Sequence, residues 1–504
     1  MARHVFELDP SNVRACRVLA EVAEKAEQPI AIEWRKKVTT LVPDSIDDSV
    51  ALAKTALRFN EITMAEKALG DIAARAQSSA PYHEVRAELA AAKKDQLTAE
   101  KEFAEAVKLD SSNKSYQLNL AVCQLKSTAP NVRSSGSATL RQFLSDKDFR
   151  APAARALRDD LAERKDVTGL LEISQILFDY PEATFRDRLF HAQLLHALDR
   201  KEFAGILSGL QNEAVNDSNK LPELLSWMSA NQLTLLALHW IKTLPDNVLN
   251  KRPVRLAVAD CYGATNDWDG LKQWCKKAQW GDLEFLRHVY LARALRELGD
   301  DSGFQAEWRT ALQNAGNDGD RLHTMQQGAA KWGWNREAEE LLWLLSKDFQ
   351  KQQGALAALY QYYVEKGDTG NLYRVVSRLC EIKSDDNRAQ NNLAQLALLL
   401  NINLDRANEV AERVYRAEPN NPVFASTYAF SLYRKGRPSQ AVQIMDKLTS
   451  ADLEKPATAA YYGIFLSEAG DKTKAAQYLD RGFQASLLPE ERALLQNARD
   501  KIGQ

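Results

Sequence analysis

The sequence predicts an all-α chain built as a solenoid of antiparallel helix pairs, and three observations lead to this prediction. Its 504 residues exceed the roughly 250–300 that a single compact core supports. Good helix formers dominate the composition, which holds only 22 Gly and 15 Pro. Small residues recur at a spacing of 34 positions, as in Ala407, Ala441 and Ala475. A repeated unit of two helices accounts for all three.

The C-terminal third carries the repeat most plainly. Gly436 and Gly470 share the 34-residue spacing of the alanines. Within the last unit, Tyr462-Gly463 followed by Leu466 gives a large-small-large pattern, and Ala475 followed by Leu479 gives a small-x3-large pattern. Small residues at such positions let two helices approach closely, while the large ones fill the remaining space. Three units can be stacked without a gap, beginning near Arg388, Pro422 and Pro456.

This pattern resembles the tetratricopeptide repeat (TPR) family, with a period of about 34 residues and the signature W-x2-L-G-x2-Y…A-x3-F…P. The number of units is similar to that of the bacterial multi-repeat type. The resemblance implies a right-handed superhelical solenoid with about fourteen repeats. Further units in the same register begin near Ile46, Ala80, Arg150, Phe185, Arg252, Phe285, Gly319 and Gln353.

The chain is expected to fall into four parts. Residues 1–12 form the remnant of an incomplete N-terminal repeat, and residues 13–251 form N-terminal repeats with a polar, stretched loop near 127–137. Regular repeats occupy 252–489, and 490–504 form a capping helix. Leu494, Ala498 and Ile502 fall on one face of that helix, as in a solvating cap.

The N-terminus begins within a repeat, because Phe6 and Leu8 belong to a second helix with no first helix before it. Such an end is expected to fray or to pair with another chain. Bacterial TPR proteins often carry an anchor or signal upstream, so a missing segment is one reading. The longest apolar stretch is far shorter than the roughly 20 residues that span a bilayer. The chain as given is therefore expected to be soluble; its compartment stays open between the cytoplasm and, if an upstream anchor or signal is missing, the bacterial cell envelope.

Charge and motifs exclude several classes of function. The formal net charge of −2 lacks the basic excess of a nucleic-acid binder. Phosphate-binding, dinucleotide-binding, nucleophile-elbow and HExxH motifs are absent from the sequence. The five cysteines lie far apart with no CxxC pair, so we expect buried free thiols: Cys16, Cys123, Cys261, Cys275 and Cys380. We expect no enzyme activity, no catalytic residue, no cofactor and no metal.

Tryptophan is the one strong shift in composition, since nine of the ten lie between Trp227 and Trp343. Trp240 and Trp308 fall at core positions of second helices. Six others fall at turns or off-core positions: Trp268, Trp274, Trp280, Trp332, Trp334 and Trp343. Two interpretations stay open, namely larger packing between repeats and an exposed aromatic patch for a partner.

The predicted function is a scaffold that binds a protein or peptide on its concave face, which repeat proteins line with first helices. In the TPR family, first-helix positions two, five, nine, twelve and thirteen line that groove. Carried onto this chain, they are Gln193, His196, Asp260, Arg293, Arg296, Gln327, Lys331, Gln361, Glu365, Asn392, Tyr433 and Arg434.

Arg293, Arg296 and Lys331 would form a local basic patch in this groove, with Arg296 alternatively paired to Glu297 or Glu307. Two other functions remain as alternatives. One is a helical-repeat protein that reads RNA. The other is an accessory subunit of a separate enzyme.

Overall fold

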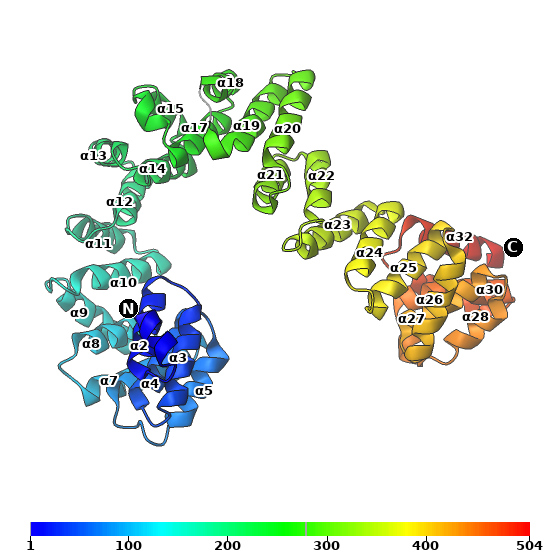
Figure 1. Ribbon diagram of the computed structural model, residues 1–504, viewed down its shortest axis with the longest axis horizontal. Helices are drawn as coiled ribbons and strands as arrows, with labels where there is room; N and C mark the ends of the chain where they lie inside the picture. Colours follow the sequence, from blue (N-terminus) through cyan, green and yellow to red (C-terminus); the bar gives the residue numbers. More distant parts are fainter. Residues whose placement is uncertain (1, 278–279, 504) are drawn as a thin grey trace. The chain divides into compact units, whose positions relative to one another are not determined.

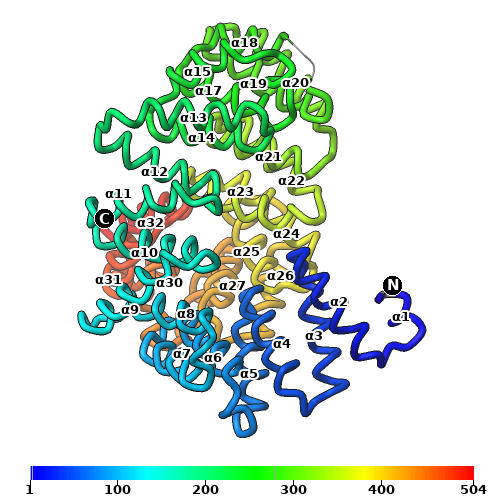
Figure 2. Tube along the Cα trace, turned by 90° about the vertical axis from the view of Figure 1, so that its left-hand side faces the viewer, coloured from blue at the N-terminus to red at the C-terminus, as the bar shows by residue number. Residues whose placement is uncertain are grey.

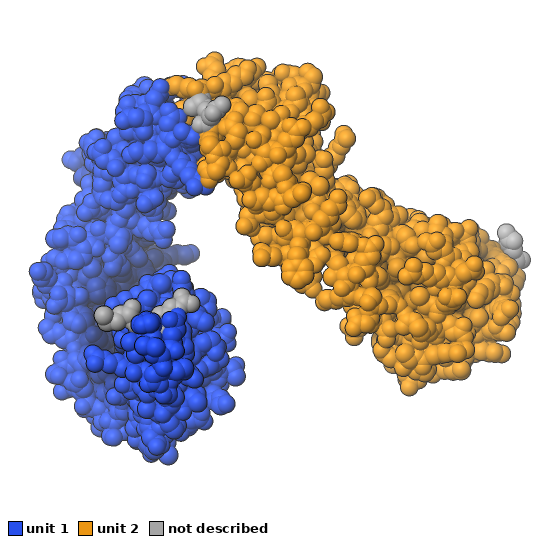
Figure 3. Space-filling view, in the orientation of Figure 1, with its two compact units in different colours: residues 1–265 blue, residues 266–504 orange. Residues whose placement is uncertain are grey.

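A computed structural model describes residues 2–277 and 280–503. Over these residues the chain folds into α-helices and one short 3-10 helix, with no strand. The helices form two compact units, Met1–Thr265 and Asn266–Gln504 (Figure 3). The prediction of an all-helical chain is confirmed.

Within each unit, consecutive helices run back and forth along the chain (Figures 1 and 2). The first unit contains α1 (Ala2–Leu8), α2 (Val13–Lys25), α3 (Ile30–Leu41), α4 (Ile46–Arg58), α5 (Ile62–Ile72), α6 (Ala80–Ala92), α7 (Gln96–Leu109), α8 (Lys114–Leu125), α9 (Pro130–Phe143), α10 (Arg150–Glu163), α11 (Val167–Phe178), α12 (Phe185–Ala197), α13 (Phe203–Val215), α14 (Lys220–Ala230), α15 (Thr234–Ile241), α16 (Asp246–Leu249) and α17 (Arg252–Ala264).

The second unit contains α18 (Trp268–Lys277), η1 (Gly281–Leu283), α19 (Glu284–Glu297), α20 (Asp301–Ala315), α21 (Gly319–Lys331), α22 (Asn335–Leu345), α23 (Gln352–Lys366), α24 (Thr369–Ile382), α25 (Asn387–Leu400), α26 (Leu404–Ala417), α27 (Pro422–Arg434), α28 (Pro438–Met445), α29 (Ser450–Leu453), α30 (Pro456–Ala469), α31 (Lys472–Gly482) and α32 (Pro489–Gly503).

The predicted unit starts coincide with the beginnings of first helices. The helices α4, α6, α10, α12, α17, α21, α27 and α30 begin at the predicted residue, and α19, α23 and α25 begin one residue earlier. The small residues that define the period are buried at helix crossings, as Ala407, Ala441 and Ala475 show. At Gly463 a Cβ atom would lie 2.9 Å from the backbone nitrogen of Leu479. A first helix and its second helix are thus in near backbone contact there.

The turn inside each pair also repeats, because one residue adopts a left-handed conformation. In the second unit this residue is mostly glycine, as at Gly299, Gly333, Gly436 and Gly470. The first unit instead uses residues with side chains, as at Lys94 and Lys165. Since the left-handed conformation costs a non-glycine residue roughly 1–2 kcal/mol, these turns carry strain that the glycine turns avoid.

Replacing Lys165 by glycine should therefore stabilise the first unit by about 0.5–1 kcal/mol, because its φ of 56° then costs nothing, although glycine enlarges the unfolded ensemble. Native-state hydrogen exchange of α10 and α11 measures the change. The reverse substitution, Gly299→Lys, should destabilise α19 and α20 by a similar amount. A Cβ atom at Gly299 would meet nothing within 4 Å, so the effect would come from the backbone conformation and not from a clash. If neither substitution changed the exchange rate, the claim that the non-glycine turns are strained would be wrong.

The predicted loop near 127–137 is wrong, since α9 begins at Pro130 and continues through Gly136. Proline is favoured in the first helical turn, where its missing N–H costs nothing. Gly136 serves a close crossing with α8, because a Cβ would lie 2.7 Å from the carbonyl oxygen of Ala121. Polarity and glycine here reflect a helix start and a helix contact.

At the N-terminus, the residues expected to be an incomplete repeat form α1, followed by a turn. The ring of Phe6 meets that of Trp34 on α3 edge to face, with centroids 4.8 Å apart. Leu8 remains exposed. Asn12 then caps α2 by accepting a hydrogen bond from the Ala15 amide, 2.9 Å away.

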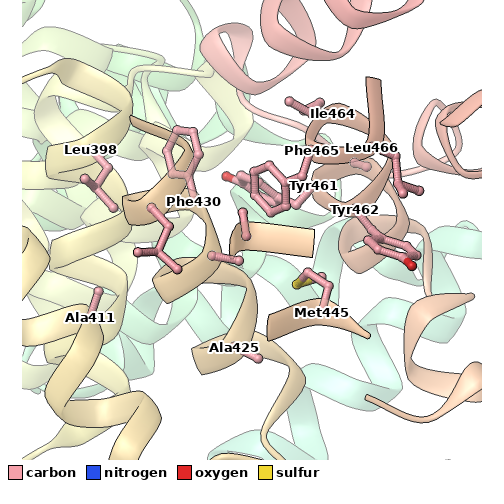
Figure 4. Packing of buried hydrophobic residues seen from close by; sticks show 14 of the residues in the cluster. Leu398, Ala411, Ala425, Phe430, Met445, Tyr461, Tyr462, Ile464, Phe465 and Leu466 are labelled. Carbon is pink, nitrogen blue, oxygen red and sulfur yellow. The ribbon is translucent and has the colours of Figure 1, made fainter. Parts of the chain in front are cut away.

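The C-terminal repeats contain a large aromatic cluster (Figure 4). The rings of Phe430 and Tyr461 meet at a centroid distance of 5.2 Å, and Tyr433 lies 5.5 Å from Phe465. Side chains of α32 pack against the same cluster. No described helix of the chain is long and apolar enough to cross a membrane.

Candidate functional site

The predicted groove residues lie on seven first helices and differ in exposure. Seven of them are exposed: Gln193, Asp260, Gln327, Lys331, Gln361, Glu365 and Arg434. Five are half-buried: His196, Arg293, Arg296, Asn392 and Tyr433. Exposure therefore varies along the first-helix face, by which we mean the surface formed by these positions.

Arg293 on α19 lies among aromatic rings. Its guanidinium lies 5.0 Å from the ring centroid of Trp268 and 4.4 Å from that of Trp332. Arg296, one turn later, lies 4.5 Å from the ring of Phe304 and 5.0 Å from that of Trp334. Planar guanidinium groups stack favourably on aromatic faces. Both arginines therefore contribute to packing between repeats.

The charge partner of Arg296 is Glu337 on α22, at 3.2 Å. The partners predicted for Arg296 from the sequence, Glu297 and Glu307, do not form this ion pair. Because Glu337 is buried, removing the arginine would leave a buried carboxylate without this cation, which is destabilising. In the predicted basic patch, Arg293 and Arg296 are thus held by aromatic rings and a carboxylate, while Lys331 is exposed.

The tryptophans favour the packing interpretation. Trp274, Trp280, Trp308 and Trp334 are buried. Trp308 and Trp334 meet edge to face with centroids 5.9 Å apart. Trp240, expected in the core, is half-buried, as are the remaining tryptophans of this region: Trp227, Trp268, Trp332 and Trp343. Wide aromatic rings fill the contacts between repeats here.

On α21 and α23 every predicted groove residue is exposed, and we call this stretch the open part of the face. Helix α21 buries Leu322, Met325 and Ala329 on one stripe, while Gln327 and Lys331 are exposed. On α23, Gln361 donates a hydrogen bond to Glu365 over 2.8 Å, and both side chains face solvent. These helices thus present polar side chains of both signs.

In the first unit, ion pairs join successive first helices. Arg17 on α2 contacts Asp48 on α4 at 2.6 Å, and Arg155 on α10 contacts Asp187 on α12 at 2.8 Å. The Nε2 atom of His196 donates a hydrogen bond to the backbone carbonyl of Asn231 over 3.2 Å. Much of the charge on this face is paired internally.

At the C-terminal end the face lies beneath α32, and we call this stretch the filled part. Tyr433 is half-buried, and burial raises the pKa of its hydroxyl, with Lys501 of α32 among the nearby charges that oppose the rise. Close by, the Tyr461 hydroxyl and the Gln395 amide both donate to Oε1 of Glu491, over 2.5 and 3.0 Å. This polar cluster could not be predicted from the sequence pattern, because its members lie up to 96 positions apart.

All five cysteines are free, and the expectation of buried thiols is confirmed for four of them, whereas Cys380 is half-buried. Burial raises the pKa of Cys261 to about 11 and that of Cys275 to about 12. Thiols with raised pKa values are poor nucleophiles at neutral pH. Across residues 2–277 and 280–503, His, Cys, Asp and Glu side chains form no group of three that could hold a metal ion.

Comparison with known proteins yields structures only. No family model matches the chain, and no curated protein matches it. It is similar to the Naa15/Naa10 complex bound to HypK-THB, at 15% identity over 96% of this chain and 70% of that one, with a TM-score of 0.26. It is similar to the Cut9–Hcn1 hetero-tetramer of APC/C, at 13% identity over 95% and 92% of the two chains, again with a TM-score of 0.26.

A third similar structure is a tetratricopeptide repeat protein from Parabacteroides merdae ATCC 43184. It is 14% identical over 48% of this chain and 96% of that one, with a TM-score of 0.26. The assignment of helix pairs to repeats rests on the period and the turns of this chain itself.

Proposed function

We propose that the chain is a non-catalytic scaffold that binds a protein or peptide along its first-helix face. The proposal rests on how buried apolar and exposed polar side chains are distributed on α21 and α23. Their apolar stripes pack within the repeats, while Gln327, Lys331, Gln361 and Glu365 face outward. Repeat proteins bind partners on such extended faces.

The mixture of charges favours a mixed-charge protein ligand over a polyanion. The exposed groove residues include Lys331 and Arg434 but also Asp260 and Glu365. A surface that binds phosphates needs a cluster of cations that releases counterions, and its affinity falls steeply with salt. We therefore place RNA second, as an outcome that the test distinguishes.

Site-specific photocrosslinking tests the proposal. A photoreactive residue at position 361 should yield protein adducts in cell extract, and nuclease treatment should not change them. The matched control carries the same group at Glu409, an exposed position on the second helix α26, and should yield few adducts. Nuclease-sensitive adducts would favour the RNA reading, and equal labelling at 361 and 409 would contradict binding on the first-helix face.

A further inference from the structure

Helix α32 packs against the last repeat, as a terminal cap would, since Arg499 pairs with Asp480 of α31 at 2.7 Å, but it also reaches further back along the chain. A cap extends the stack and contacts only the last repeat. Here the Thr369 hydroxyl, at the start of α24, donates a hydrogen bond to Glu490 over 2.5 Å. At the other end of α32, the Ser467 hydroxyl of α30 donates to the carbonyl of Ala498 over 3.1 Å. The helix thus reaches from α24 to α30, and Figure 1 shows it beside both α25 and α30. The contacts with α24 and α25 are additional to those of the predicted cap.

The surface that α32 covers is the first-helix face of the C-terminal repeats. Ser467 and Glu468 occupy, 34 residues later, the positions of the predicted groove residues Tyr433 and Arg434. Lys501 pairs with Glu468 at 2.7 Å. The helix α32 therefore lies on the equivalent of the surface that remains open on α21 and α23.

Part of this face is apolar, because Tyr461 and Phe465 belong to the buried cluster that α32 joins through Leu495 and Ala498. Ten consecutive residues of α30, from Thr458 to Ser467, are buried, which means that the helix is covered on all sides. In contrast, α21 buries one stripe of three residues. An apolar first-helix face needs an amphipathic occupant, whereas the polar face of α21 can meet water.

Only a few residues of α32 are buried against the face that it covers. Of its fifteen residues, α32 buries Glu491, Leu495 and Ala498, which share one face at a spacing of four and three. Glu491 accepts hydrogen bonds from Tyr461, Gln395 and the Leu488 amide, the last over 2.9 Å. Gln395 also donates to the Tyr461 hydroxyl over 2.9 Å. On the buried face of α32 the carboxylate makes the polar contacts, and the leucine and alanine fit the apolar residues beneath them.

We propose that the face formed by α25, α27 and α30 is a docking site for a short amphipathic helix with the pattern Glu-x3-Leu-x2-Ala, and that α32 is its internal occupant. A partner helix with the same pattern competes with α32 for Tyr461 and Gln395. This inference rests on the proposed function and specifies the ligand of one part of the face.

The test uses the full chain and a labelled peptide with the sequence of residues 486–503. In the release variant, Glu491→Ala with Leu495→Ala, α32 loses its carboxylate and its buried leucine, so the peptide should bind at least about tenfold more tightly than to the unaltered chain. A peptide carrying Glu491→Gln should bind about tenfold more weakly than the parent peptide. The control variant, Gln496→Ala with Asn497→Ala, changes exposed residues of α32 and should behave as the unaltered chain.

Equal peptide binding by the release variant and the unaltered chain would overturn the proposal. So would loss of hydrogen-exchange protection in α25, α27 and α30 of the release variant, because α32 would then be part of their core. A second measurement keeps every groove residue native: a protease site is inserted between Gln484 and Ala485 and cut, and exchange of α32 for the labelled peptide is followed. Exchange with the repeats still folded supports the site, and no exchange overturns it. Crosslinking at position 361 does not depend on α32, so the two proposals can fail separately.

Discussion

Replacing Gly482 by valine should melt the last repeat while leaving the first unit folded. Gly482 ends α31 at its contact with α30, where a Cβ atom would lie 2.6 Å from Cα of Ala460. Because the obstacle is backbone, no side-chain rotation relieves it, and the helices must separate. We expect a loss of about 3 kcal/mol or more, at the upper end for overpacking. Hydrogen exchange should rise across residues 456–503.

The local character of the effect is itself part of this prediction. In a repeat array each unit contacts mainly its neighbours, so stability is close to a sum of local terms. The matched control is Gly209→Ala, since that glycine of α13 meets nothing within 4 Å. It should stabilise its helix by up to about 1 kcal/mol. A uniform loss of protection across both units in Gly482→Val would contradict the nearest-neighbour picture.

The repeat register could be predicted from the sequence because each repeat makes its packing contacts with residues about 34 positions away. Buried alanines such as Ala441 and Ala475 leave a periodic trace, and the turn glycines leave another. The same local logic failed at Gly136, where a glycine needed for a helix crossing resembled a loop residue. A glycine alone does not distinguish a turn from a close contact.

The filled part of the first-helix face could not be predicted, because it depends on contacts of α32 with residues that are not one repeat length away. Glu490 meets Thr369 across 121 positions. Likewise, the groove positions of the TPR family predict that Arg293 faces a groove, but they do not predict that the rings of Trp268 and Trp332 lie beside it. Aromatic side chains at turns can extend into neighbouring repeats, and the sequence pattern does not specify which residues their rings contact.

Replacing Asp187 by asparagine should cost the first unit about 2–3 kcal/mol at neutral pH. The carboxylate is only 4% exposed and contacts Arg155 and Arg158, each at 2.8 Å. It also accepts hydrogen bonds from the amide and the hydroxyl of Thr184, at 3.0 and 2.8 Å, which cap α12. Asparagine keeps the shape but removes the charge that two arginines share, and breaking one partner of a buried pair is costly. The exposed carboxylate of Glu182, which pairs with Arg150, provides the control: Glu182→Gln should change stability little.

The same site predicts a distinct dependence on pH. Burial alone would raise the pKa of Asp187, but the hydrogen bonds from Arg155 and Thr184 outweigh it and lower the pKa from 3.8 to about 2. Because the folded pKa lies below the unfolded one, the stabilisation is present above about pH 4 and is lost as the pH falls toward 2. The shift corresponds to about 2.5 kcal/mol. Protection of α10–α12 from hydrogen exchange, corrected for intrinsic rates, should therefore fall more steeply between pH 5 and 3 in the unaltered chain than in Asp187→Asn. Parallel pH profiles would show that the carboxylate is not the group that titrates, and the arginine pair would then stabilise α12 through its packing alone.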